Sequence, residues 1–167
     1  MAANTRTEDN LKKAFDGEAK ASLRLLGFAQ KAADEGYPQM AKMFRAIAAA
    51  ERVHGLRVLR LLKIIRSTEE NLKFSFESET NVSDNAYPPM IQAADEEGNE
   101  PARIAFSQAR DVEDIHAKLY KNAIDHMVAE TETTYFVCQV CGYVAEGQAP
   151  DNCPICNAKR EMFLQID

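Results

Sequence analysis

The sequence predicts a mainly α-helical chain in which a bundle of four long helices precedes a small strand-and-turn domain. Two copies of one motif, Glu51-Arg-Val-His54 and Glu113-Asp-Ile-His116, each place a carboxylate and an imidazole on one face of a helix. The residues around the two motifs repeat at a nearly constant offset, which indicates an internal duplication. All four cysteines lie between positions 138 and 156, after the repeated part.

The first two helices are predicted over 7–35 and 38–66. Gly36 and Pro38 separate them, because glycine often ends a helix and proline suits a first turn. Each helix carries a stripe of mostly apolar residues in steps of three and four, which we call its seam. The candidate ligands occupy seam positions where a bundle normally buries apolar side chains. The first seam is Leu11, Phe15, Glu18, Ser22, Leu25, Ala29 and Ala32, and the second is Met40, Phe44, Ile47, Glu51, His54, Val58, Leu61 and Ile65.

The third and fourth helices are predicted over 69–97 and 100–130. Ser67 or Thr68 caps the third, and Pro88 and Pro89 predict a kink near Tyr87. The third seam follows the first at an offset of 61, and the fourth follows the second at 62. We attribute the change to one residue inserted in the run 93–98. The third seam is Leu72, Phe76, Glu79, Ser83, Ala86, Met90 and Ala93, and the fourth is Ala102, Phe106, Ala109, Glu113, His116, Tyr120, Ala123 and Met127.

Domain boundaries follow from the loss of the helical pattern in the polar segment 129–134. We place a helical domain at 1–130, a linker at 131–134 and a second domain at 135–167. Neither half of the duplication can bury its own seam, so the two halves must pack together. The second domain is too small to fold by apolar burial alone and needs a metal ion.

The carboxylate and histidine residues in the seams predict a site for two metal ions. Four buried carboxylates without cations cost several kcal/mol each, and two divalent cations neutralise them. Solvent-exposed helix faces are the alternative, which the apolar neighbours along each seam disfavour. Oxygen and nitrogen ligands suit iron or manganese, and His126 is expected to be a surface residue outside the seam. The six candidate ligands are Glu18, Glu51, His54, Glu79, Glu113 and His116.

The cysteines form a second predicted metal site of four thiolates, Cys138, Cys141, Cys153 and Cys156. A structural zinc ribbon is the alternative that spacing alone leaves open. We favour iron, because an iron tetrathiolate exchanges one electron, which a neighbouring two-metal site can use. The absence of other cysteines suits metal thiolates in a reducing compartment better than disulfides.

Composition limits the partners. The net charge is −6 and no basic run occurs, which argues against nucleic acid and anionic membranes. The most apolar stretch, 56–65, is interrupted by Arg57, Arg60 and Lys63, so no membrane span is expected. The polar start does not resemble a targeting segment, and we expect a cytoplasmic protein.

Over essentially its whole length the chain resembles a rubrerythrin, a ferritin-like four-helix bundle followed by a rubredoxin-like domain. The motifs that carry the resemblance are Phe15-Asp-Gly-Glu18, Ala50-Glu51-Arg-Val-His54, Glu77-Ser-Glu79, Tyr87-Pro88, Glu113-Asp-Ile-His116, Cys138-x-x-Cys141-Gly-Tyr and Cys153-Pro-x-Cys156. The resemblance implies reduction of hydrogen peroxide to water at two iron ions. It also implies a third iron ion in the tetrathiolate site, which relays electrons from an external reductase. The implied assembly is a homodimer in which each rubredoxin-like iron serves the partner's di-iron site, sometimes with helices exchanged.

Two positions depart from the family pattern. Val82 stands where the family usually has a further glutamate, which binds one iron ion in the oxidised state before that ion moves to the second-helix histidine. We therefore hypothesise that His54 remains a ligand in both redox states. Leu25 replaces a common tyrosine, whereas Tyr87 keeps its counterpart beside the ligands, so hydrogen bonding around the site is expected to be asymmetric.

Two alternative functions remain from the sequence. With only six common ligands, the site could favour dioxygen, as a ferroxidase or oxygen-reducing oxidase does. A non-catalytic electron-transfer or metal-binding protein would use the bundle only as a scaffold. Iron storage is less attractive, since the cysteine domain has no role in a mineral cage.

Overall fold

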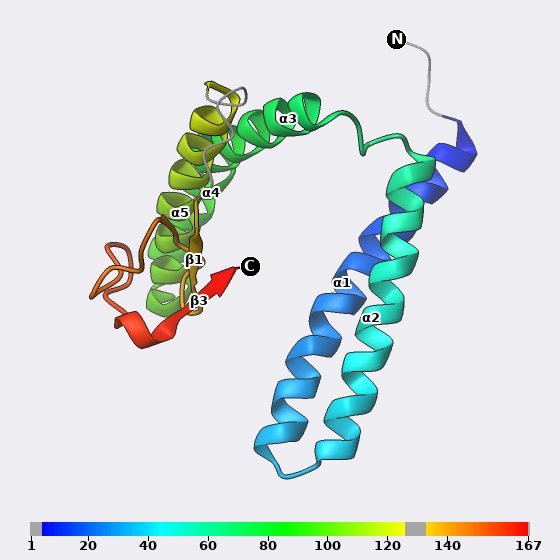
Figure 1. The fold of residues 1–167 in the computed structure, drawn as a ribbon, viewed down its shortest axis with the longest axis horizontal. Helices are drawn as coiled ribbons and strands as arrows, with labels where there is room; N and C mark the ends of the chain where they lie inside the picture. The colour runs from blue at the N-terminus through cyan, green and yellow to red at the C-terminus, as the bar shows by residue number, and fades with distance from the viewer. Residues whose placement is uncertain (1–4, 126–132, 167) are drawn as a thin grey trace. The chain divides into compact units, whose positions relative to one another are not determined.

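The computed structural model describes residues 5–125 and 133–166 of the chain (Figure 1). The chain divides into two compact units, Met1–Arg66 and Ser67–Asp167, which are described separately. The first unit contains two helices, and the second contains helices followed by a small sheet. In the described ranges, no helix combines the length and the apolar character needed to cross a membrane.

The first unit is an antiparallel hairpin of α1 (Arg6–Asp34) and α2 (Pro38–Leu61), which lie side by side in Figure 1. The Thr5 hydroxyl caps α1 by accepting a hydrogen bond from the Glu8 N–H at 3.2 Å. Gly36 adopts a φ of +80° in the turn, and proline occupies the first turn of α2. These boundaries agree with the predicted turn at Gly36 and Pro38.

Small residues form the contact between α1 and α2. The Ser22 hydroxyl donates a hydrogen bond to the Ala48 carbonyl at 2.9 Å, and a Cβ on Gly55 would meet Glu18 Cβ at 3.8 Å. Larger seam residues stay open, since Met40, Ile47 and Leu61 are 46%, 41% and 60% exposed. The hairpin therefore leaves much of its seam exposed, which agrees with the prediction that one half of the duplication cannot bury its own seam. The buried residues of this unit are Ala29, Ala32, Ala41, Ala48 and Gly55.

The predicted end of the second helix at residue 66 is wrong, because α2 ends at Leu61. Lys63 has a φ of +54°, and the Ile64 N–H donates to the Leu59 carbonyl at 3.1 Å. This is the hydrogen bond of a Schellman motif, which usually contains glycine at the left-handed position. A lysine there gives no recognisable stop signal in the sequence. Ile65 consequently lies in the loop, where it is 48% exposed.

The third predicted helix is divided into α3 (Thr68–Asn81), a π-helical turn over Val82–Ala86, and α4 (Tyr87–Glu96). Ser67 is the N-cap of α3 and forms a capping box with Glu70. The interruption comes just before the predicted kink at Tyr87. Proline lacks an N–H and its ring crowds the carbonyl four residues earlier, so a wider turn ahead of Pro88 relieves both problems.

The π-helical turn also corrects the predicted third seam. Ala94 is 5% exposed, whereas the predicted seam residues Met90 (46% exposed) and Ala93 face solvent. A π turn takes up one extra residue, so the later seam positions shift by one. The inserted residue of the second repeat therefore lies in Val82–Ala86 and not in the run 93–98. With this correction Ala94 matches buried Ala32, and Tyr87 matches Leu25.

The last helix, α5 (Glu100–Asp125), packs against both α3 and α4. The rings of Tyr87 and Phe106 lie 6.3 Å apart in this contact. The predicted end of the helix at residue 130, seam residue Met127, His126 and residues 131 and 132 of the predicted linker lie outside the described residues.

The C-terminal segment forms an antiparallel sheet in the order β2-β1-β3, as the strand-like pattern predicted. The strands are β1 (Tyr135–Cys138), β2 (Val144–Glu146) and β3 (Phe163–Ile166). In register, Val137 pairs with Val144 on one side and with Leu164 on the other. Tyr143 and Phe163 pack edge to face at 6.3 Å, and β2 contacts α5. The sheet therefore belongs to the same unit as the second Glu-x-x-His motif.

Candidate metal centres

The first candidate metal centre lies in the first unit, on the facing helices α1 and α2. Glu18 comes from α1, and Glu51 and His54 come from α2, one helical turn apart. His54 Nδ1 lies 3.0 Å from Glu51 Oε2 and 3.8 Å from Glu18 Oε1. One ligand atom from each residue falls within a 4.8 Å cluster. The imidazole is the open part of this group, with 58% of its side chain exposed.

The second candidate centre repeats this arrangement in the second unit. Glu79 comes from α3, and Glu113 and His116 come from α5. His116 Nδ1 lies 2.9 Å from Glu113 Oε2, and the two side chains are 24% and 23% exposed. Its three ligand atoms also lie within 4.8 Å of one another. Each half of the duplication thus offers two carboxylates and one imidazole.

Both clusters have the spacing of ligands around one cation. Adjacent ligands with bonds of about 2.1 Å at right angles lie about 3.0 Å apart. The imidazole nitrogen and carboxylate oxygen in each motif are separated by that distance. When their lone pairs face each other, they need a proton or a cation between them. The donor set therefore fits a divalent metal ion in each cluster.

In the second cluster, closely spaced carboxylates shift the pKa values of neighbouring groups. Burial, a hydrogen bond with Glu113 and the charge of that carboxylate raise the pKa of Glu79, although His116 acts in the opposite direction. Burial and the charges of Glu113 and Glu79 also raise the pKa of Tyr87. The phenol of Tyr87 is thus in the electrostatic field of this cluster. A cation bound by the carboxylates removes the cause of both charge effects.

Val82 contributes no ligand to the second cluster. It is half-buried, begins the π-helical turn and lies three residues after Glu79. Within the described residues, neither cluster includes a third carboxylate. A side chain without lone pairs at this position leaves the two clusters with matching donor sets.

The third candidate centre is formed by two similar turns in the C-terminal sheet region. Cys141 is followed by Gly142 at a φ of +84°, and Cys156 is followed by Asn157 at a φ of +60°. Gly142 N–H donates to the Cys138 carbonyl and Asn157 N–H to the Cys153 carbonyl, both at 2.9 Å. The repeated Cys-x-x-Cys spacing therefore folds into two equivalent turns, here called knuckles.

The four sulfur atoms have tetrahedral spacing. Cys138 Sγ lies 3.7 Å from Cys156 Sγ, and Cys141 Sγ lies 3.6 Å from Cys153 Sγ. A tetrahedron with metal–sulfur bonds of about 2.3 Å has edges of about 3.8 Å. This geometry fits iron or zinc, both of which bind four thiolates in this way.

Backbone amides support thiolates at this centre. Burial raises the pKa of Cys138, but the N–H groups of Cys141 and Val140 and hydrogen bonds with the Cys156 and Cys141 thiols together outweigh that effect and lower the pKa overall. Burial raises the pKa of Cys141 and of Cys156, against single amides that favour their thiolates. A metal ion supplies the positive charge that the thiolates of Cys141 and Cys156 need.

All ten predicted ligands fall into three groups, with the six carboxylate and histidine residues divided between the two units. One contact was missed from the sequence. His116 Nε2 lies 3.2 Å from the Gly142 carbonyl oxygen, so the first knuckle touches α5 beside the second cluster. Gly142 after the cysteine indicated a knuckle turn, but nothing in the sequence indicated which helix that turn would touch.

Family models match both parts of the chain. A rubrerythrin model matches residues 9–124, and a model of the rubrerythrin rubredoxin-like domain matches residues 136–164. The chain is 32% identical to nigerythrin of Nitratidesulfovibrio vulgaris strain Hildenborough, over 98% of this chain and 90% of that protein. It is 33% identical to rubrerythrin of Porphyromonas gingivalis, over 95% of this chain and 89% of that protein.

Solved structures of nigerythrin resemble the chain in fold. The partially reduced state covers 99% of this chain and 89% of its own, with a TM-score of 0.59 and 31% identity. The fully reduced, all-ferrous state has the same TM-score and coverage at 30% identity. The fold class is thus mainly α, with ferritin-like helices and a small rubredoxin-like domain.

Proposed function

Because the chain belongs to the rubrerythrin family of oxidoreductases, we propose that it reduces hydrogen peroxide to water at a pair of iron ions. The observation that carries this proposal is the matched pair of Glu-Glu-His clusters in a chain that also has a tetrahedral cysteine site. Glu18, Glu51 and His54 hold one part of the iron centre, and Glu79, Glu113 and His116 hold the other. The centre is complete when a first unit pairs with a second unit, from the same chain or from a second copy in a homodimer.

The proposed domain organisation is the one drawn from the sequence: an iron-binding helical domain at 1–130, a linker at 131–134 and a rubredoxin-like domain at 135–167. The rubredoxin-like site holds a further iron ion, with zinc as the structural substitute. An external reductase supplies its electrons. The contact between Gly142 and His116 supports electron entry at the second cluster, because a short bonded path joins Cys141 to that imidazole.

Iron ions, when bound, supply the two electrons and the Lewis acidity with which peroxide is cleaved to two waters. The chain's own residues hold and orient that chemistry and manage its protons. In the metal-free protein, burial and Glu113 raise the pKa of Glu79 and so favour a proton on its carboxyl, which iron binding would displace. The Tyr87 hydroxyl stays protonated beside the same carboxylates and can donate a hydrogen bond toward them.

Comparing two oxidants tests the proposed reaction. The fully reduced, iron-loaded protein is mixed with equimolar peroxide or dioxygen in a stopped-flow instrument, and reappearance of the oxidised iron absorbance is followed. We expect reoxidation by peroxide to be at least tenfold faster. A Glu113→Gln variant should lose the fast phase, while Glu77→Gln, on an exposed part of α3, should keep it. Faster reoxidation by dioxygen would contradict the peroxidase assignment.

Dioxygen reduction, as in a ferroxidase or oxidase, is the second candidate function, and Val82 is the observation that favours it. Valine cannot act as the additional carboxylate ligand that the family usually has three residues after Glu79. We infer that His54 remains an iron ligand in both redox states of this protein. Oxidised and reduced crystals test this prediction, which fails if His54 leaves the metal in either state. A Val82→Glu variant is expected to regain a redox-dependent shift of one iron ion by more than about 1 Å, with Val82→Gln as the neutral control.

A further inference from the structure

The imidazole of His116 is held from two sides, and the second side belongs to the cysteine domain. Its Nε2 lies 3.2 Å from the Gly142 carbonyl oxygen, within hydrogen-bonding range. A carbonyl oxygen only accepts hydrogen bonds, so Nε2 is the protonated nitrogen in this contact. Nδ1 is then the nitrogen that faces Glu113 at 2.9 Å. The knuckle thereby determines which nitrogen offers a lone pair to the cluster.

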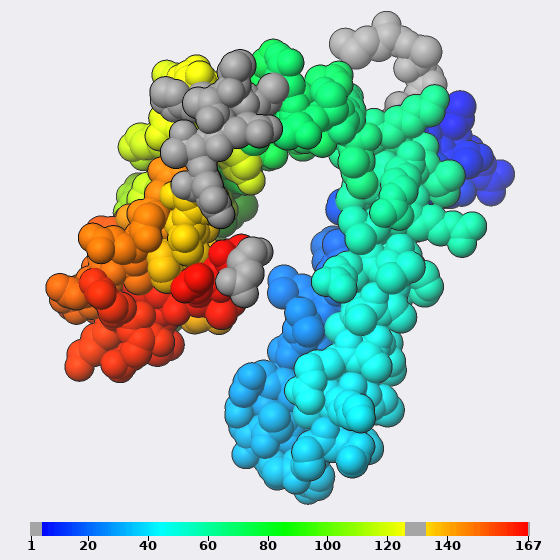
Figure 2. Space-filling model, viewed as in Figure 1, coloured from blue at the N-terminus to red at the C-terminus, as the bar shows by residue number. Residues whose placement is uncertain are grey.

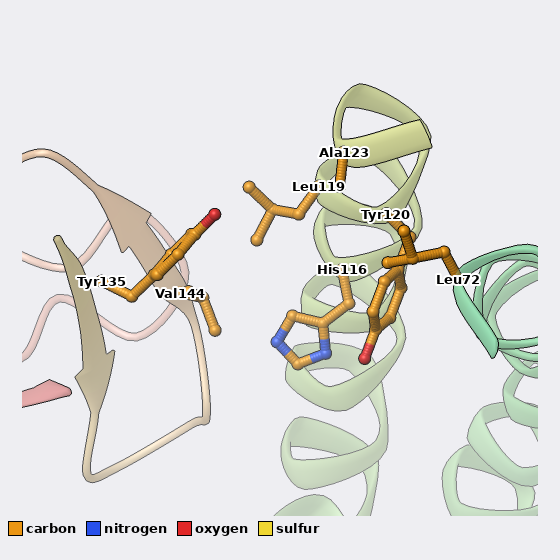
Figure 3. A pocket seen from close by; sticks show the side chains of 7 residues that line it. All are labelled: Leu72, His116, Leu119, Tyr120, Ala123, Tyr135 and Val144. Atoms are coloured by element: carbon orange, nitrogen blue, oxygen red, sulfur yellow. The ribbon is translucent and has the colours of Figure 1, made fainter. Parts of the chain in front are cut away.

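Packing beside this hydrogen bond holds the knuckle against α5. A Cβ on Gly142 would meet Val112 Cγ1 at 3.8 Å, and Val112 is only 3% exposed. Figure 3 shows the His116 ring projecting from α5 into a space that Val144 and Tyr135 of the sheet border on the other side. Val112 precedes His116 by one helical turn, so the apolar contact and the hydrogen bond lie on the same side of α5.

Within residues 5–66 of the first unit, the first repeat contains no equivalent of this contact. Ala50 is the counterpart of Val112 at the offset of 62, and it is exposed on α2. The His54 side chain is 58% exposed, compared with 24% for His116. The two clusters thus have the same donor types but different support for the imidazole.

We propose that the cysteine domain positions His116 for metal binding, so that metal in the four-cysteine site raises the metal affinity of the second carboxylate cluster. A domain of this size depends on its metal for folding, and only the folded knuckle presents the Gly142 carbonyl. Fixing the far nitrogen of a ligating histidine in this way is worth about 10- to 100-fold in metal affinity. The cysteine site therefore fills first and prepares the second cluster. The inference rests on the proposed role of His116 as an iron ligand.

A Val112→Glu variant of the full chain is designed to break the contact between the Gly142 knuckle and α5 without altering any metal ligand. The charge disfavours the buried contact with Gly142, while glutamate is a good helix former at a position on α5. Ala50→Glu places the same side chain at the matching exposed position of α2 and is the control. Val112→Ala, which removes two methyl groups, provides a milder second variant. Circular dichroism and a count of zinc bound by the thiolates establish that each variant is folded.

Zinc is the probe, since it is diamagnetic and suits both donor sets. In the zinc-saturated wild type, ¹⁵N-histidine spectra should show a slowly exchanging Nε2–H for His116 and a rapidly exchanging one for His54. Competition with a chelator then measures the zinc affinity of the carboxylate clusters, after the first equivalent has filled the four-cysteine site. Val112→Glu is expected to abolish the slow Nε2–H and to weaken this binding about 10- to 100-fold, with a smaller effect for Val112→Ala and none for Ala50→Glu.

Two results would overturn the inference, and they are distinguishable. If Val112→Glu loses the slow Nε2–H but binds zinc as tightly as the wild type, the knuckle does not prepare the cluster and the proposed function stands. If the wild type binds zinc only at its thiolates, the carboxylate clusters are not metal sites and the proposed function fails as well.

Discussion

At the scale of single residues, the two Glu-x-x-His motifs show how a metal site is built at the cost of stability in the metal-free protein. Three side chains in each cluster direct acceptor atoms at one point, within 4.8 Å. The electrostatic repulsion within such a cluster is clearest at Glu79, because burial and the neighbouring Glu113 raise its pKa. The folded state therefore binds a proton at Glu79 more tightly than the unfolded state does. Stability from this carboxyl is fully present below its unfolded pKa and is lost as the pH rises through its raised folded value.

Replacing Glu79 by glutamine is expected to stabilise the metal-free protein at pH 7, by up to about 1 kcal/mol after allowance for solvent screening. Glutamine mimics the protonated carboxyl and removes the repulsion by Glu113. The gain should disappear at about pH 3, below the ordinary glutamate pKa, where the wild-type carboxyl is protonated in both states. Urea unfolding at the two pH values measures the difference, with Glu77→Gln as the control on the exposed side of α3. A gain that is equal at both pH values would exclude charge repulsion as the cause.

At the scale of helices and strands, the sequence pattern anticipated most elements, and its errors occurred where backbone geometry departs from a regular helix. Periodicity and the Gly36–Pro38 turn located α1 and the start of α2. The end of α2 was missed because a lysine adopts the left-handed conformation that glycine usually signals. The register of α4 was missed because a pattern of apolar residues does not reveal that one residue is taken up by a π turn.

Adjacent alanines in α4 give a direct test of this register. Ala94→Asp should destabilise the protein by about 2–4 kcal/mol, since it buries a charge without a partner at a position that is 5% exposed. Ala93→Asp introduces the same residue at an exposed position of the same helix and should change the stability by less than about 0.5 kcal/mol. Thermal unfolding of both variants under identical conditions measures the effect. If Ala93→Asp destabilised the protein more than Ala94→Asp, the seam predicted from the offset of 61 would be correct instead.

The candidate sites were more predictable than the helix boundaries, because their chemistry depends on local spacing. Residues three apart on a helix share a face, so Glu113 and His116 had to lie together wherever α5 was placed. Cys-x-x-Cys pairs carry similar information about a knuckle. The contact of Gly142 with His116 was not predictable, since it joins segments 26 residues apart through a backbone carbonyl that any residue provides.

At the scale of the whole molecule, the two units, which Figure 2 draws in blue to cyan and in green to red, differ sharply in charge. Each unit also leaves large apolar side chains exposed. Residues 1–66 contain thirteen Lys and Arg against seven Asp and Glu, a net charge of +6. Residues 67–167 contain seven Lys and Arg against nineteen Asp and Glu, a net charge of −12. Opposite charges favour pairing of a first unit with a second unit and oppose pairing of like units. That is the pairing that the proposed six-ligand iron centre requires, whichever chain supplies each unit.

Reversing charges should therefore weaken the iron centre at low ionic strength without changing a ligand. Arg57→Glu with Arg60→Glu lowers the charge of the first unit by four, at exposed positions near the C-terminal end of α2. We expect manganese affinity of the carboxylate clusters to fall about tenfold at 20 mM salt and to match the wild type at 0.5 M, where charges are screened within a few ångströms. Adding Lys73→Glu and Lys121→Glu, at exposed positions of α3 and α5, should restore the affinity, because it lowers the charge of the second unit by four and so returns the difference in charge between the units to its wild-type value. A loss of affinity that persists at 0.5 M salt, or that the second pair of reversals does not repair, would point to damage within α2 and rule out selection of the partner unit by charge.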